Sequence, residues 1–147
     1  MNGPGEITAA LLKVLELLFI SFMIIMTLSS YLANREMSFI TSQVSMMAKE
    51  MVDQADKDGG FSEGEYQRIQ NKFLNEKIKT WVKPSDVEIV YISPAMGTKR
   101  TYLGQPVTIR LKVNAKKLGH GWIKKEIEVQ SSSVNRGNYG DGYAIKS

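Results

Sequence analysis

The apolar run LLFISFMIIMTLSSYLA, residues 17–33, contains no ionisable side chain except the phenol of Tyr31. Apolar residues continue backwards to Ile7, with Lys13 and Glu16 as the charged residues among them. A helix over residues 7–33 is about 40 Å long at 1.5 Å per residue, which exceeds the roughly 30 Å of hydrocarbon in a bilayer. The run therefore predicts a helix that can cross a membrane.

Two other interpretations of this run fit the sequence less well. A secretory signal peptide has a basic start, a short apolar core and a small-residue cleavage site, whereas this chain carries Glu6 ahead of the run and continues a helical pattern beyond Ala33. A core helix of a soluble protein needs a second large apolar surface, and the sequence contains no other apolar run of this length. We therefore expect residues 1–33 to be buried in lipid or among copies of the chain, with Pro4 at the helix start.

Lys13 and Glu16 are the informative residues of this segment, because an ionised side chain at hydrocarbon depth costs on the order of 3 kcal/mol. Their spacing of three lets them pair on one helix face. Two interpretations stay open: both side chains reach the membrane interface, or Glu16 lies among packed helices and pairs with a cation of its own or a neighbouring subunit. The short segment before the helix and the long one after it favour a single pass with the N-terminus inside and the C-terminus outside.

Residues 34–83 are expected to be helical in two parts. Apolar side chains recur at steps of three and four and form a stripe: Met37, Ile40, Val44, Met47, Met51 and Ala55. We predict one continuous helix from near Pro4 to about Asp56, ended by the glycine pair 59–60. A second helix over residues 63–79 follows a capping box formed by Ser62 and Glu65.

Beyond Asp86 the apolar period changes to two, which is typical of strands with one apolar face. Three such segments lie in residues 84–131, and their apolar sets are Val87, Ile89 and Tyr91; Val107, Ile109, Leu111 and Val113; and Ile123, Ile127 and Val129. Turn residues between them predict an antiparallel meander, with room for a short extra strand near residues 101–103, and residues 132–147 are rich in Ser, Gly and Asn and predict a tail. The expected fold is α+β: a long N-terminal helix, a shorter second helix and a small antiparallel sheet of three or four strands.

The composition excludes most kinds of chemistry. The chain has 147 residues, no Cys, one His and a formal net charge of +4. It can form no disulfide framework, thiolate metal site or His cluster, and we expect neither an enzyme nor a bound cofactor. Outside residues 1–33 there are 18 basic and 13 acidic residues, but they are dispersed, which is typical of a solvated surface and not of a specific nucleic-acid site. His120, between two glycines, is expected to be an exposed loop residue.

Residues 54–65, QADKDGGFSEGE, resemble a calcium-binding EF-hand loop. Asp56 and Asp58 stand at loop positions three and five and Glu65 at position twelve, but Gln54 replaces the Asp expected at position one. A helix stop followed by a capping box explains the same residues. A calcium-responsive surface adhesin is therefore kept as a further alternative function.

The apolar N-terminal helix with Glu16 inside it, the amphipathic continuation and the small C-terminal sheet together are similar to type IV pilins and pseudopilins. Val14-Leu15-Glu16-Leu17-Leu18 resembles the pilin pattern of a lone Glu near the start of the helix, and residues 17–62 look more like TadE-like minor pseudopilins and related Gram-positive conjugation or secretion membrane proteins. The chain departs from pilins in one respect: pilin processing follows a Gly a few residues ahead of that Glu, whereas here Gly3 and Gly5 precede Glu6. Either Glu6 takes that place in a processed chain, or the chain is not processed.

The resemblance implies a structural subunit that is held in the membrane by its apolar helix and then moved into an extracellular, pilus-like helical filament. Its partners would be copies of itself, membrane lipid before assembly, and the secretion or assembly machinery. The residues expected at the assembly surface are Lys13, Glu16, Glu6, Ser21, Phe22 and Ser29. The main alternative is a single-pass accessory protein of a conjugation or secretion apparatus that does not polymerise.

Overall fold

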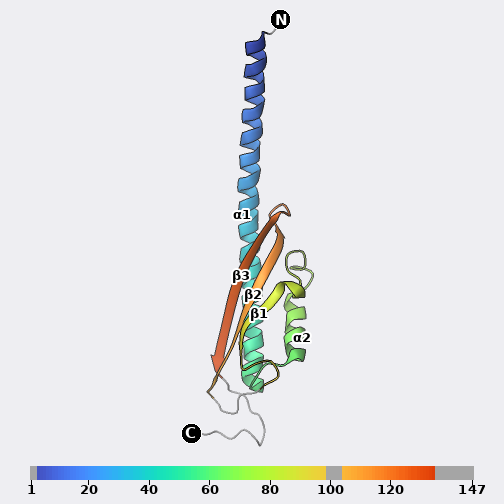
Figure 1. The fold of residues 1–147 in the computed structure, drawn as a ribbon. Helices are drawn as coiled ribbons and strands as arrows, with labels where there is room; N and C mark the ends of the chain where they lie inside the picture. Colours follow the sequence, from blue (N-terminus) through green and yellow to red (C-terminus); the bar gives the residue numbers. More distant parts are fainter. Residues whose placement is uncertain (1–2, 99–103, 135–147) are drawn as a thin grey trace, which may run out of the picture.

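The computed structural model describes residues 3–98 and 104–134. Its elements, in chain order, are helices α1 (Pro4–Asp58) and α2 (Glu63–Phe73), a short 3-10 turn η1 (Pro84–Asp86), and strands β1 (Val87–Ser93), β2 (Pro106–Leu118) and β3 (Ile123–Val134). Helix α1 is one continuous rod of 55 residues, and the sheet and α2 cover only its C-terminal half (Figure 1). The α+β class is confirmed.

The three strands form an antiparallel meander in the order β1-β2-β3. Strand β2 lies at the centre, and its inward side chains are fully buried: Val107, Ile109, Leu111, Val113 and Ala115. In β1 a register shift between Ile89 and Tyr91 changes the alternation, so Ile92 packs against the core while Tyr91 is 50% exposed. The predicted inward position of Tyr91 is therefore wrong.

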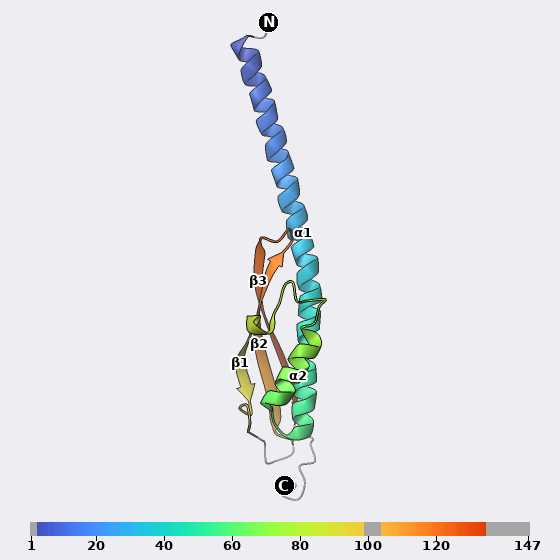
Figure 2. The ribbon, with the colours of Figure 1, turned by 90° about the vertical axis from the view of Figure 1, so that its right-hand side faces the viewer.

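The apolar stripe of α1 covers the sheet, because both present apolar faces of matching length. Ile40, Val44 and Met47 are completely buried, and Figure 2 shows the sheet along one side of the rod. Helix α1 ends where Gly59 takes a left-handed conformation with φ 83°, as the glycine pair predicts. At this end the Ser133 hydroxyl donates to the Asp56 carboxylate at 2.9 Å, which ties β3 to the last turn of α1.

Helix α2 is shorter than predicted. It begins at the predicted residue, with the Ser62 hydroxyl accepting the Glu65 backbone N–H at 3.3 Å, but the Glu65 carboxylate binds Arg68, so only this half of the predicted capping box forms. The helix ends at Phe73 and not near residue 79. The cause is Asn75, whose side chain donates to the Lys72 carbonyl and accepts the Lys77 backbone N–H, in competition with helical hydrogen bonds.

The limits of the predicted segments also differ in part from the structure. Strand β3 runs to Val134, three residues into the predicted tail. The extra strand proposed near residues 101–103 and tail residues 135–147 lie outside the described residues.

Candidate functional site

The N-terminal half of α1 exposes apolar side chains on all its sides. Between residues 7 and 28 its large apolar side chains are 40–65% exposed: Ile7, Leu11, Leu12, Val14, Leu15, Leu17, Leu18, Phe19, Ile20, Phe22, Met23, Ile24, Ile25, Met26 and Leu28. The most apolar stretch of 18 residues has a mean hydropathy of 2.3, and none of it is buried inside the chain. A surface of this kind is far larger than soluble monomers expose, so helix α1 fits a membrane or the packed core of a filament.

The head begins at Ser29. This side chain is fully buried because the turn between β2 and β3 lies on it, and the Ser29 hydroxyl is hydrogen-bonded to Nδ1 of His120. The adjacent Gly119 backbone N–H donates to the Glu36 carboxylate at 2.8 Å. The uncovered part of α1 is therefore residues 4–28, about 37 Å at 1.5 Å per residue, and residues 29–33 belong to the head and not to the predicted segment 1–33.

Five of the six expected assembly residues lie on the uncovered part of α1, where all five are exposed: Glu6, Lys13, Glu16, Ser21 and Phe22. Ser29 does not join them, since its hydroxyl is hydrogen-bonded to His120 of the same chain. Lys13 and Glu16 lie on neighbouring faces, about 60° apart around the helix, whereas Ser21 and Phe22 lie well over 90° from Glu16. The five residues thus point to different sides of the helix and form no single patch.

The neck of the β2–β3 hairpin is held by a charge pair. Lys116 Nζ lies 3.0 Å from Asp86 Oδ1, and the Lys116 backbone N–H donates to the Trp81 carbonyl. Partial burial by itself would raise the pKa of Asp86, but hydrogen bonds from the Lys83 backbone N–H and the Lys116 ammonium group hold this pKa below its ordinary value. The positive charge of Lys116 is therefore paired with Asp86 within the head.

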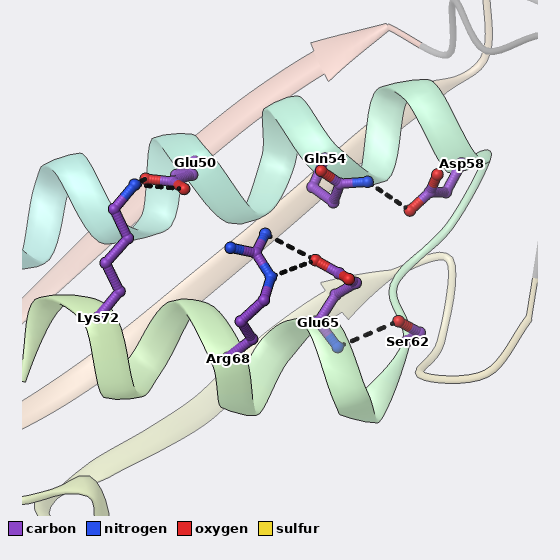
Figure 3. A network of polar contacts seen from close by, with 7 residues as sticks. All are labelled: Glu50, Gln54, Asp58, Ser62, Glu65, Arg68 and Lys72. Carbon is purple, nitrogen blue, oxygen red and sulfur yellow. Dashed lines mark hydrogen bonds and ion pairs between the residues drawn. The ribbon is translucent and has the colours of Figure 1, made fainter.

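The EF-hand-like segment does not form a calcium loop. Gln54, Asp56 and Asp58 lie in the last turns of α1, and the Gln54 amide donates to Asp58 at 2.8 Å (Figure 3). The Asp56 carboxylate accepts a hydrogen bond from the Ser133 hydroxyl. The Glu65 carboxylate pairs with Arg68 of the same helix, at 2.7 Å (Figure 3). Within residues 3–98 and 104–134, no three Asp, Glu, His or Cys side chains come together as a metal site.

Sequence reasoning missed the contact between the hairpin turn and α1. His120 is exposed and lies in a turn, as predicted, but it also binds Ser29 across 91 positions of sequence. The sequence offers only Gly119 itself; the fold shows that its φ is 64° and that a Cβ there would lie 2.8 Å from the Ser29 carbonyl oxygen.

Comparison with known proteins gives no relative: no family model, curated protein or solved structure matches the chain.

Proposed function

We propose that this protein is the structural subunit of an extracellular, pilus-like filament, stored in the membrane by α1 and assembled by packing of the same helix. One observation carries the proposal: a folded head leaves residues 4–28 of α1 uncovered and apolar on all sides. Such a helix fits lipid, and it also fits a bundle of parallel copies in which side-chain contacts replace lipid contacts. In the proposed orientation the N-terminus lies inside the cell and the head outside.

The head limits how deeply α1 enters the membrane, and this limit bears on Glu16. With Ser29 at the outer boundary, a hydrocarbon layer about 30 Å thick extends back to about residue 9. Lys13 then lies about 6 Å inside the inner boundary, within reach of the headgroups for a long side chain, whereas Glu16 lies about 10 Å inside it. Glu16 therefore carries the larger cost in the membrane-stored subunit.

A filament offers Glu16 a partner. Lys13 and Glu16 are one helical turn apart, so a parallel neighbour displaced along the axis by three residues, about 4.5 Å, brings its Lys13 level with Glu16. Pairing between helices lowers the cost of burying the Glu16 carboxylate relative to an unpaired one and sets the axial register of the two subunits. Ser21, a small side chain on another face, allows a close approach of a further helix.

A single-pass accessory protein of a conjugation or secretion apparatus is the second candidate. The length of the uncovered helix favours it, since about 37 Å is enough for one bilayer crossing without any filament. In that case α1 remains in lipid and no copies stack.

Electron microscopy of the wild-type chain separates the two candidate functions, and substitutions at Glu16 and Lys13 test the role of the charge pair. We expect Glu16→Ala to abolish filaments in sheared cell-surface material, seen by electron microscopy, while the chain still sediments with membranes. The double variant Lys13→Glu/Glu16→Lys keeps the pair with its charges exchanged and should restore filaments. Normal filaments in Glu16→Ala would refute the role of the pair, and a wild-type chain found only in membranes would favour the accessory protein.

A further inference from the structure

The tip of the β2–β3 hairpin lies at the level where the uncovered part of α1 ends. Gly119 and His120 rest on Ser29, so the tip stands beside the first covered turn of the helix (Figure 1). When α1 crosses a membrane, hydrocarbon cannot extend past this contact. Side chains around the tip are therefore at the depth of the lipid headgroups.

Two aromatic side chains are exposed at this level, on opposite sides of α1. Trp122 is 56% exposed on the hairpin, with its ring edge-on to His120 at a centroid distance of 6.2 Å. Tyr31 is 62% exposed on α1, and because it follows Ser29 by two residues it lies about 200° around the helix from the hairpin. Trp and Tyr are the residues that concentrate at membrane interfaces, where the ring is in the apolar layer and the polar atom is hydrated.

The tip is also basic. The segment KKLGHGWIKK, residues 116–125, contains four Lys and no acid. Lys116 is paired with Asp86 and Lys125 donates to the neutral Asn34 side chain, while Lys117 and Lys124 are exposed. The nearby Glu36 carboxylate faces the hairpin backbone, where it accepts the Gly119 N–H. The tip thus presents positive charge beside exposed aromatic rings.

The geometry points to a second membrane contact besides α1: Tyr31, Lys117, Trp122 and Lys124 form a collar that binds the phosphate headgroups of anionic phospholipids. This inference rests on the membrane-stored state of the proposed function. Each lysine held near an anionic surface strengthens the attraction about fivefold, and the two aromatic rings hold the head against the bilayer on both sides of α1. The collar would set the depth of α1 and keep the head from tilting before assembly.

Tryptophan fluorescence of the full chain tests the collar, because the chain has two Trp and the second, Trp81, packs on Phe39. Phe39 follows Ser29 by ten residues, so Trp81 lies about 15 Å farther along the rod. The full chain is reconstituted in vesicles of phosphatidylcholine and phosphatidylglycerol that carry a headgroup nitroxide in both leaflets. Wild type is compared with Trp122→Phe, in which Trp81 is the remaining emitter.

Insertion is scored first, by flotation of the vesicles. We expect the headgroup nitroxide to quench the fluorescence of wild type at least about twofold more than that of Trp122→Phe. A nitroxide deep in the acyl chains should quench wild type less than the headgroup nitroxide does. Lys117→Glu/Lys124→Glu should abolish this excess. The matched variant Lys49→Glu/Lys57→Glu changes the net charge equally at exposed sites about 30 and 42 Å from Ser29, well beyond the Debye length, and should retain the excess.

The outcomes separate the collar from the proposed function. A chain that floats with equal quenching of wild type and Trp122→Phe overturns the collar and leaves membrane storage intact. Quenching that persists in Lys117→Glu/Lys124→Glu overturns the role of the lysines. A chain that does not float overturns membrane storage, and the collar with it.

Discussion

Replacing Gly119 with alanine should detach the hairpin tip from α1. The new Cβ would lie 2.8 Å from the Ser29 carbonyl oxygen and 3.1 Å from Cδ1 of Ile123. Backbone atoms of a helix do not move aside, so the tip must shift outward. This shift breaks the hydrogen bond between Ser29 and His120 and the one from the Gly119 N–H to Glu36.

The loss can be estimated from three contributions. Alanine with a positive φ costs about 1 kcal/mol. A hydrogen bond to a charged group contributes about 1.5 kcal/mol or more, and one between neutral side chains about 1 kcal/mol. The head should therefore lose about 3.5 kcal/mol of unfolding free energy, summed from these contributions.

Gly121→Ala is the matched control for this substitution. Gly121 also has a positive φ, 96°, but a Cβ there meets nothing within 4 Å. Only the conformational cost of about 1 kcal/mol remains.

Urea unfolding in mild detergent micelles, followed by tryptophan fluorescence, measures both variants. We expect the midpoint to fall markedly more for Gly119→Ala, with unchanged dependence of the free energy on urea. Equal losses in the two variants would show that the tip does not rest on α1, and they would remove the basis for the depth assigned to Glu16.

Three further predictions concern the stability of the head, and the same urea titration measures each of them. Ile40→Ala should cost about 2–5 kcal/mol because this side chain is completely buried, whereas Leu11→Ala, at a position 59% exposed, should leave the unfolding of the head unchanged; similar losses in both would contradict the boundary at Ser29. Ser62→Ala should cost about 1 kcal/mol through loss of the cap on Glu65, and Ser62→Asp should recover it. The pKa of Asp86 is lower in the folded chain than its ordinary 3.8. The stability that the Asp86 carboxylate contributes is therefore complete above pH 3.8 and is lost as the pH falls through the lowered pKa. Asp86→Asn should therefore be less sensitive to acid than wild type, and identical pH profiles would argue against this pair.

The helical half of the fold was predictable because its signals are local. The stripe from Met37 to Ala55 predicted the buried face of α1, and the glycine pair predicted its end within two residues of Asp58. The strands were predictable for the same reason, except where the register shift near Tyr91 moved Ile92 inward. Helix α2 was predicted too long, because the hydrogen bonds of Asn75 that end it depend on side-chain geometry and not on the apolar period.

The candidate site, like the fold, was predictable from the sequence only in its local features. An apolar run with Lys13 and Glu16 in it is visible in the residues alone, since hydrophobicity and charge need no neighbours to be recognised. The calcium interpretation of residues 54–65 failed because Gln54, Asp56 and Asp58 belong to the last turns of α1, as the alternative interpretation of a helix stop implies.

The level at which the apolar helix ends is a property of the folded chain. It depends on how far β2 and β3 extend along α1 before they turn, and so on the register that brings Gly119 to Ser29. Residues 90 positions apart meet only after the sheet has packed on the helix, and no local pattern encodes that distance. Composition and period predict an apolar helix that fits lipid or packed copies of the chain, whereas packing of the hairpin sets how much of the helix is left uncovered and where Glu16 lies within the uncovered part.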